Sequence, residues 1–569
     1  MNFVERLGVK ECSWQAFERM LARLLTCEGY QNVRQVGGSG DHGADVIATK
    51  YNKRWLIQAK QWRKPAGISV LNETLAAMKF YQAAIPVIAA SNGFDADLKQ
   101  QQIVLQSQGI PLQLWDSDVL LQRASRLQLD KVINTKEPRE YQKDAINNII
   151  QPFFDQYSNR SLIVLATGLG KTFVAAEAMR RITSVKPIRV LVLAHTNSLV
   201  YQLEKSFWPF LTPEQSTLVW NGYEHPDMNR GYDYVFACID TVYEAFQKNI
   251  TYDFDAIIID ECHHAGSASY RKLIDYYDAG KINGPFLLGL TATPWRPDEN
   301  DIKAIFGDPR ITIDMVFGMR HGFLTNVDYR MYTDNIDWNS LKRFDGKLFS
   351  PRQINRTLFI NQWDDAVVTE LQKAWYEQQN PRAIVFCGTI DHAIKMRDRI
   401  NALGFCNAAA VFAGSKDAPE EQPFYVRNKI MCDFSDGIVN VVCAVDVFNE
   451  GIDVPDVNII VFQRVTHSRR IFIQQLGRGL RISDDKDKVI VLDFVSDIRR
   501  FAAGIDLKDR LSEKEATRVD IPNKVTFRKV GGEDPQTEMF LREWLDDVAT
   551  IEDANEDSSI LKFPPQIIS

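Results

Sequence analysis

The sequence predicts an α/β protein of several domains. Its 569 residues exceed what a single hydrophobic core sustains, so three or four domains are expected. From 139 to about 320, short apolar runs alternate with helical segments, and the same alternation resumes between 383 and 492. Such alternation is typical of parallel sheets covered by helices on both faces. A shorter mixed pattern ahead of residue 130 indicates a further, smaller α/β domain.

The small N-terminal domain is expected to span residues 1–130. Its apolar side chains recur first at helical spacing and then in short strand-like runs bounded by polar turns. The expected elements are a helix at 14–30, ended by Gly29, and strands at 44–49, 54–59 and 85–90. We place the boundary in the polar segment 131–138, which ends in proline.

Two larger parallel-sheet domains are expected next, at 131–320 and 321–500. The expected strands are 162–165, 190–193, 234–237, 256–259 and 286–289 in the first, and 383–386, 408–412, 439–444, 459–462 and 489–492 in the second. The stretch 321–380 is more irregular and is expected to link the two. Residues 501–569 are expected to form a small C-terminal extension.

The net charge of −7 does not exclude a nucleic-acid partner. The acidity is concentrated in 533–557, where Arg542 is the only basic residue, and we expect that segment to be solvated. An alternative is that it docks a partner or imitates DNA. No apolar run is long enough to span a membrane and the first residues lack a signal-peptide pattern, so we expect a cytoplasmic protein. Eight cysteines without a CxxC pair predict neither a disulfide framework nor a structural zinc site.

The first candidate site is a glycine loop between the strand at 162–165 and a helix. Gly168 and Gly170 allow backbone N–H groups to turn toward an anion at the helix N-terminus. Lys171 is expected to reach the β- and γ-phosphates of ATP, and Thr172 to hold Mg²⁺. Leu165 stands where the full pattern has its first glycine, a difference that we expect to be tolerated.

The second part of this candidate site is an acidic pair that follows another predicted strand. Asp260 and Glu261 come directly after the apolar run 256–259, at the carboxyl end of a predicted strand, where parallel sheets bind ligands. Asp260 can coordinate Mg²⁺, and Glu261 can polarise the water that attacks a phosphate. Together with the glycine loop, this pair indicates a site that hydrolyses ATP.

In these motifs and their order, the chain resembles the superfamily 2 helicases of the DEAH-like group. The matching segments are 139–142, 166–172, 193–202, Thr241, 260–263, 291–293, 383–389, 449–453 and 474–481. The resemblance implies two RecA-like lobes, with Gln142 on the adenine and with Gly451 and Asp453 at the nucleotide. It also implies that Arg478 and Arg481 are arginine fingers from the second lobe, and that His263 couples the ATP site to that lobe.

The second candidate site lies in the N-terminal domain. Gln58 and Lys60 are two residues apart on a predicted strand and therefore project from the same face. Asp45 on the neighbouring strand and Glu18 on the preceding helix can add carboxylates, which together with an amide oxygen could hold Mg²⁺. The alternative is structural: a turn aspartate, a hydrogen-bonding glutamine and a solvated lysine.

With their surroundings, these residues resemble the Mrr-like restriction endonuclease domain of the PD-(D/E)xK group. The resemblance covers about 12–125 and rests on 17–18, 40–45, 57–60 and 89–94. It implies a PD-(D/E)xK-type fold with Asp45, Gln58 and Lys60 as the catalytic core and Glu18 as an accessory. Gln58 replaces the commoner Glu or Asp, so it offers an oxygen but no charge.

The two resemblances predict an ATP-dependent DNA translocase or helicase fused to a Mg²⁺-dependent endonuclease, in restriction or anti-phage defence. The alternatives are a DNA-repair helicase-nuclease and a helicase with a non-cutting DNA-binding domain. The partner is expected to be DNA, with RNA not excluded, and a homo-oligomer or a defence-system protein is a possible further partner. Trp55, Trp62 and Trp115 could stack on bases, but packing in the core or at its rim is expected.

Overall fold

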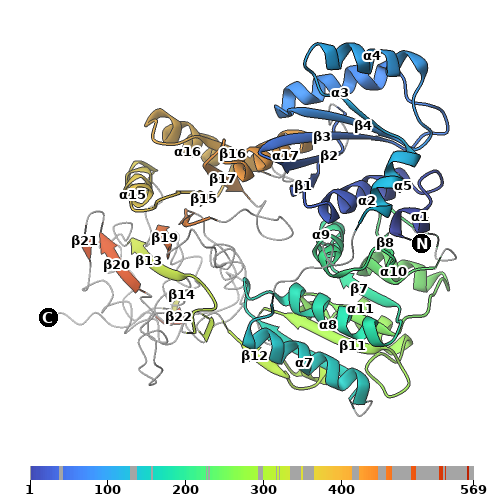
Figure 1. Ribbon diagram of the computed structural model, residues 1–569. Helices are drawn as coiled ribbons and strands as arrows, with labels where there is room; N and C mark the ends of the chain where they lie inside the picture. The colour runs from blue at the N-terminus through green and yellow to red at the C-terminus, as the bar shows by residue number, and fades with distance from the viewer. Residues whose placement is uncertain are drawn as a thin grey trace.

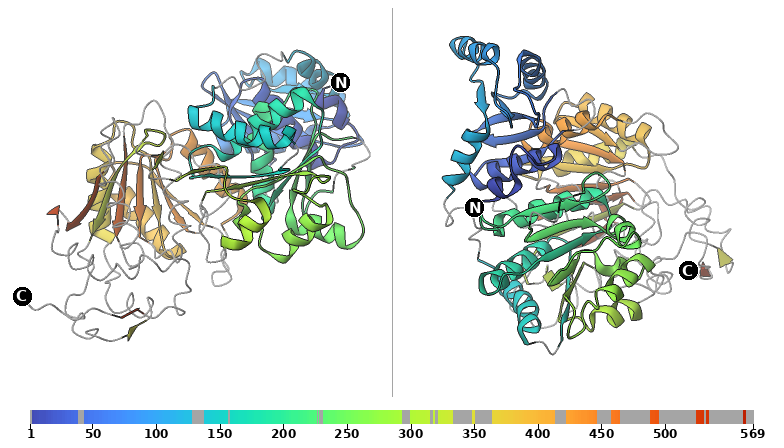
Figure 2. Two further views of the ribbon diagram at one scale, coloured as in Figure 1. Left: turned by 90° about the horizontal axis from the view of Figure 1, so that it is seen from below. Right: turned by 90° about the vertical axis from the view of Figure 1, so that its right-hand side faces the viewer.

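The computed structural model describes residues 2–37, 43–127, 137–155, 158–225, 227, 231–292, 299–314, 317–318, 321–332, 348–349, 364–412, 422–445, 457–463, 488–494, 524–529, 532–533 and 561–562. Three sheets of five, seven and eight strands form the N-terminal domain, lobe 1 and lobe 2 (Figures 1 and 2). The predicted α/β class is therefore confirmed. Within those ranges, no helix is long and apolar enough to cross a membrane.

The N-terminal domain has a mixed sheet of order β1-β2-β3-β4-β5. Its strands are β1 (Gln31–Gln35), β2 (Val46–Lys50), β3 (Lys53–Lys60), β4 (Ile85–Ala90) and β5 (Gln113–Trp115). β2 and β3 form the predicted antiparallel hairpin, and their tight turn places Tyr51 and Asn52 at positive φ, as hairpin turns of this length require. β3, β4 and β5 are parallel.

Helices cover both faces of this sheet. One face carries α1 (Phe3–Leu7), α2 (Trp14–Cys27) and α5 (Ser117–Ser125), and the other carries α3 (Ile68–Tyr81) and α4 (Ala96–Ser107). Trp55 and Trp115 are buried on the first face, so the expectation that they pack in the core is confirmed. Leu56 lies on the α3 face with Ala77 and Tyr81, and alternation along β3 turns Gln58 and Lys60 to that face as well.

Lobe 1 is a parallel sheet of order β12-β6-β11-β10-β7-β9-β8. Its strands are β6 (Arg160–Leu165), β7 (Val190–Ala194), β8 (Thr217–Trp220), β9 (Tyr234–Cys238), β10 (Ala256–Ile259), β11 (Phe286–Thr291) and β12 (Ile311–Ile313). One face carries α7 (Glu140–Asp155), α8 (Lys171–Val185) and α9 (Asn197–Phe207), and the other α10 (Ile239–Gln247), α11 (Ala268–Tyr276) and α12 (Glu299–Phe306).

Lobe 2 has the sheet order β16-β17-β15-β18-β19-β13-β20-β21. Its strands are β13 (Asn326–Tyr332), β15 (Ala383–Phe386), β16 (Ala408–Phe412), β17 (Val441–Val445), β18 (Ile459–Phe462), β19 (Lys488–Phe494), β20 (Lys524–Lys529) and β21 (Gly532–Glu533). Its helices include α15 (Asp364–Tyr376), α16 (Ile390–Ala402) and α17 (Phe424–Ser435).

Two parts of lobe 2 differ from expectation. β13 comes from the stretch expected to be an irregular link, but it lies inside the sheet, between β19 and β20. β20 comes from the expected C-terminal extension and pairs in parallel with β13. Both strands find their partners far away in the sequence, which a local pattern does not reveal.

Candidate functional site

The predicted phosphate loop lies between β6 and α8. Gly168 and Gly170 have φ angles of 91° and 85°, a left-handed conformation that glycine adopts without strain. Lys171 begins α8, so the loop ends at a helix N-terminus whose N–H groups and dipole favour an anion. Leu165, which departs from the full glycine pattern, is buried as the last residue of β6.

Two side chains of α7 hold this loop from the side. Gln142 Nε2 donates to the carbonyl oxygen of Leu169 at 3.1 Å, and the Tyr141 hydroxyl donates to the same oxygen at 2.9 Å. A Cβ at Gly170 would lie only 2.9 Å from that Gln142 nitrogen. The structure thus places Gln142 against the phosphate loop, and its contact with adenine stays a prediction.

The acidic pair lies where β10 ends, opposite the loop. Glu261 Oε1 is 3.5 Å from Lys171 Nζ, so the two predicted catalytic groups face one another. His263 is buried, and its Nδ1 lies 3.3 Å from Glu261 Oε2 and 3.3 Å from the hydroxyl of Thr291 on β11. His263 therefore links the acidic pair to Thr291, the first residue of the matching segment 291–293.

The surroundings of Asp260 fit a divalent cation. Burial raises the pKa of Asp260 above its ordinary value, and the neighbouring Glu261 carboxylate raises that pKa further. Its Oδ1 is buried, and no hydrogen-bond partner for it exists among the described residues. A buried carboxylate oxygen of this kind gains stability from a cation, so Asp260 fits the predicted Mg²⁺ site, and the role of Thr172 there stays a prediction. Gly451, Asp453, Arg478 and Arg481 lie outside the described residues.

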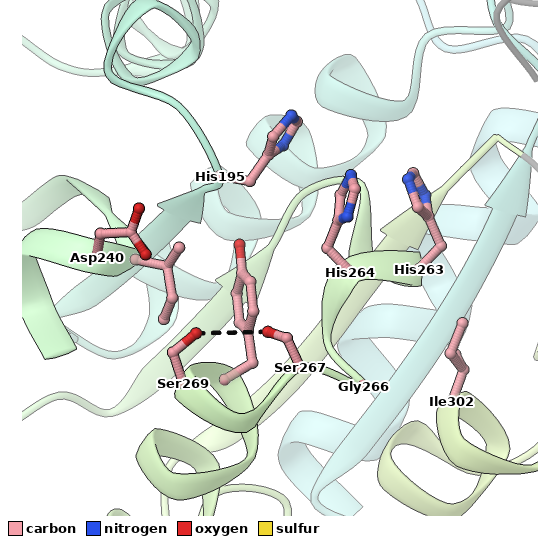
Figure 3. Close-up of a pocket in the computed structure, with 10 residues that line it drawn as sticks. His195, Asp240, His263, His264, Gly266, Ser267, Ser269 and Ile302 are labelled. Atoms are coloured by element: carbon pink, nitrogen blue, oxygen red, sulfur yellow. Dashed lines mark hydrogen bonds between the residues drawn. The ribbon is translucent and has the colours of Figure 1, made fainter. Parts of the chain in front are cut away.

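A polar cavity of about 400 Å³ opens beside the acidic pair, at the carboxyl ends of β7, β9 and β10 (Figure 3). His195, Asp240, His263 and His264 line it, together with the hydroxyl groups of Ser267 and Ser269. The rings of His195 and His264 are 4.5 Å apart between centroids. His264 therefore lines this cavity together with His195, which belongs to the matching segment 193–202.

The predicted site of the N-terminal domain is also assembled. Asp45 Oδ2 accepts a hydrogen bond of 2.6 Å from the backbone N–H of Ala59, the residue between Gln58 and Lys60. A Cβ at Gly37 would lie 3.1 Å from Asp45 Oδ1 and 3.2 Å from Glu18 Oε2, so the two carboxylates flank this glycine. Both side chains are largely buried, at 8% and 9% exposure.

A residue that the sequence analysis missed joins this site from α3. Glu73 Oε2 accepts from Gln58 Nε2 at 2.8 Å and forms an ion pair of 3.2 Å with Lys60 Nζ. Its neighbour Thr74 is fully buried and donates to Gln58 Oε1. The available signal was a polar Thr74 on the apolar face of the helix, because such a residue needs a polar partner beneath it.

Among the described residues, no three His, Cys, Asp or Glu side chains already converge as a metal site. The donor set at this place still fits a hard cation such as Mg²⁺, which prefers carboxylate and amide oxygens. Glu18 and Asp45 would hold such a cation. Gln58 turns its amide oxygen to Thr74, so the amide offers a nitrogen toward Glu73.

The N-terminal domain docks on lobe 1 through buried arginines of α2. Arg19 forms ion pairs with Glu204 (2.9 Å from Nε) and Glu224, and its side chain is 5% exposed. Burial lowers the pKa of Arg19, but the carboxylates of Glu204 and Glu224 outweigh burial and raise it overall. Arg23 donates to the carbonyl oxygens of Gln215 and Thr212 at 2.9 and 3.1 Å.

The same domain docks on α17 of lobe 2 (Figure 1). Arg54 on β3 donates to Asp433 Oδ1 at 3.1 Å and to Asp436 Oδ2 at 2.9 Å. Arg34 Nη2 donates to the Ser435 hydroxyl at 2.7 Å, and Asn428 Nδ2 donates to the carbonyl oxygen of Val36 at 3.2 Å. The N-terminal domain therefore bridges the two lobes by polar contacts on both sides.

Family models match each part of the chain. A model described as "Restriction endonuclease" matches residues 9–124, one described as "Type III restriction enzyme, res subunit" matches 135–296, and "Helicase conserved C-terminal domain" matches 365–483. The chain therefore joins a restriction-endonuclease domain to two helicase domains. The restriction-endonuclease match falls on the N-terminal domain, and the other two matches fall on lobes 1 and 2.

The chain is similar to an Escherichia coli protein named "Type I restriction enzyme EcoAI endonuclease subunit", with 28% identity over 74% of this chain and 55% of that subunit. It is also similar to "DNA 3'-5' translocase XPB2" of Sulfurisphaera tokodaii, with 24% identity over 62% of this chain and 81% of that protein. The solved structure "ATP-dependent Type ISP restriction-modification enzyme LlaBIII bound to DNA" matches 95% of this chain and 42% of that chain at 17% identity and a TM-score of 0.49. The chain thus spans little more than half the length of the EcoAI subunit.

Proposed function

We propose that this helicase–endonuclease moves along DNA with energy from ATP hydrolysis and cuts DNA by Mg²⁺-dependent hydrolysis, in restriction or anti-phage defence. The observation that carries the proposal is that β3 holds Lys60 of the nuclease site near one end and Arg54, which binds lobe 2, near the other. A motor lobe that moves would act directly on the strand that carries the nuclease site.

In the motor, Lys171 neutralises the phosphates of ATP and Glu261 polarises the attacking water. Thr172 and Asp260 would hold Mg²⁺, which would supply positive charge to the phosphates. The family resemblance adds Gln142, Gly451 and Asp453 at the nucleotide, and Arg478 and Arg481 from lobe 2. Closing of the lobes on ATP and their opening after hydrolysis would move the strand contacts stepwise.

DNA is the proposed partner of the motor. The cavity lined by His195 and His264 lies at the carboxyl edge of lobe 1, beside segment 193–202. Contacts at this edge would be mainly to phosphates, so little sequence preference is expected. The relative named as a DNA translocase supports DNA over RNA.

In the nuclease, Asp45 and Glu18 would hold Mg²⁺, with Gln58 beside them and Lys60 at the scissile phosphate or the attacking water. A role in defence is supported by the relative named as a restriction-enzyme endonuclease subunit. We place the protein in the cytoplasm, with a second copy or a defence-system protein as its proposed partner.

Plasmid cleavage tests this function. Wild type, Lys60→Ala and Lys171→Ala would be compared with Mg²⁺, in the presence and absence of ATP. Loss of cleavage in Lys60→Ala, and loss of the ATP dependence alone in Lys171→Ala, would support the proposal. ATP hydrolysis by wild type without cleavage of any DNA form would favour a motor with a non-cutting DNA-binding domain. Preference for damaged over foreign DNA would favour a repair enzyme.

A further inference from the structure

We propose that Glu73 acts on the divalent cation of the nuclease site through the waters of that cation and provides the negative charge that Gln58 cannot. The proposal rests on the proposed nuclease function. Glu73 belongs to α3, fifteen residues beyond Gln58, and lies outside the motif that carries the family resemblance. Two facts place it at the site: its contacts with Gln58 and Lys60, and its distance from the loop that leads to Asp45.

The hydrogen bonds of Gln58 fix which of its atoms faces Glu73. A carboxylate only accepts hydrogen bonds, so the amide atom 2.8 Å from Glu73 Oε2 is the nitrogen, and the amide oxygen accepts from Thr74. Gln58 has no exposed surface, so water does not compete for these bonds. In this arrangement Gln58 positions Glu73, and the acidic oxygen next to Lys60 comes from α3.

Lys60 already places a positive charge at this oxygen. Its ammonium group is 3.2 Å from Glu73 Oε2, the same atom that accepts from Gln58. The Glu73 side chain is 50% exposed, so it is open to an ion from solution. A divalent cation carries more charge than an ammonium group and would compete with Lys60 for this carboxylate. Lys60 would then be released toward the DNA phosphate.

Gly43 packs against Gln58 and Glu73 and lies two residues ahead of Asp45 in the chain. Its φ of +86° suits glycine, and a Cβ there would lie 2.8 Å from Gln58 Nε2 and 3.0 Å from Glu73 Cβ. Asp45 follows two residues later and flanks Gly37 together with Glu18. Mg²⁺ usually keeps several of its waters, so Glu73 can act on a cation held at Asp45 and Glu18 by accepting from those waters.

Metal titration of the full chain without nucleotide tests the proposal. Mn²⁺ binding would be measured by calorimetry in wild type, Glu73→Gln and Glu28→Gln. Glu28 is a matched control, because its carboxylate also pairs with a cation, that of Arg123, and its backbone accepts from Lys50 at the β2–β3 turn, at the far end of β3 from Lys60. We expect Glu73→Gln to weaken Mn²⁺ binding by about tenfold or more, as removal of groups around a metal does, and Glu28→Gln to leave it unchanged.

A double variant distinguishes the loss of the Glu73 charge from a change in the fold of the site. If the site needs a carboxylate that Gln58 lacks, Gln58→Glu in the Glu73→Gln background will restore Mn²⁺ affinity. Equal affinities of wild type and Glu73→Gln would overturn the proposal, and so would a loss that Gln58→Glu does not restore. Asp45→Asn tests the proposed nuclease function itself. If wild type binds Mn²⁺ weakly and Asp45→Asn binds it equally weakly, both the nuclease function and the role of Glu73 are overturned.

Discussion

Arg54 of the nuclease domain and Asp433 of lobe 2 form a buried ion pair, with Nη1 and Oδ1 3.1 Å apart. The side chains are 6% and 8% exposed, so the pair is shielded from salt. The same guanidinium binds Asp436 and the carbonyl oxygen of Tyr81. This contact fixes the strand of the nuclease site to the motor lobe that is expected to move.

Replacement of Arg54 is expected to destabilise this dock. Arg54→Met leaves the Asp436 carboxylate without its cation and leaves Asp433 with Lys429 alone, and breaking a buried pair from one side costs about 3 kcal/mol. The midpoint of thermal unfolding should fall. Adding Asp433→Asn and Asp436→Asn should recover part of the lost stability, because the side chains that faced Arg54 then carry no charge. A triple variant no more stable than Arg54→Met would contradict this reading.

The contact between the N-terminal domain and lobe 1 predicts a similar loss of stability on substitution. Arg19→Met strands two buried carboxylates, those of Glu204 and Glu224, and should lower the unfolding midpoint by a comparable amount. Arg126 is exposed and makes a suitable control, since Arg126→Met is expected to change stability by less than about 0.5 kcal/mol. Equal midpoints for the two variants would show that the Arg19 contact adds nothing.

Gly43→Ala should impair DNA cleavage and spare ATP hydrolysis. Its new Cβ would press on Gln58 and Glu73, whereas Gly93→Ala meets no atom within 4 Å. Both glycines have positive φ, so the backbone strain of about 1–2 kcal/mol is shared and only the clash differs. Cleavage rates should fall about tenfold or more in Gly43→Ala alone. A similar loss in Gly93→Ala would assign the effect to backbone strain.

Substitutions of Lys171 and Glu261 should impair different steps of ATP binding and hydrolysis. Lys171→Ala removes the charge at the phosphates, so nucleotide binding and hydrolysis are both expected to fall. Glu261→Gln keeps the shape of the side chain and should retain ATP while turnover drops by about a hundredfold or more, since only activation of the water is lost. Fluorescent-nucleotide binding and phosphate release distinguish the two. Weak nucleotide binding in Glu261→Gln would be against the assigned role.

The motor site was largely predictable from the sequence. The glycine loop and the acidic pair each sit at the end of a buried strand, and parallel pairing brings strand ends to one edge, which places Lys171 opposite Glu261. The pairing of Gln58 and Lys60 on one face followed from strand alternation in the same way. Local patterns therefore predict residues whose positions depend on the strand that carries them.

Residues placed by packing between elements were not predictable. Glu73 reaches the nuclease site only because α3 packs on β3, and the polar Thr74 beside it is the one local sign of that contact that we identify. In the sequence alone, Arg19 and Arg54 look like ordinary charged residues, because the carboxylates that they bind belong to the two lobes. β13 and β20 became strands of lobe 2 through partners distant in the sequence.

The central claim is that movement of the motor reaches the nuclease through Arg54. The most direct measurement is the ratio of plasmid cleavage rates with and without ATP, in wild type and in Arg54→Met, with ATP hydrolysis recorded in the same reactions. We expect a ratio well above one in wild type that falls toward one in Arg54→Met while ATP hydrolysis continues. The same ratio in both proteins would contradict it, since the nuclease would then respond to ATP without this contact.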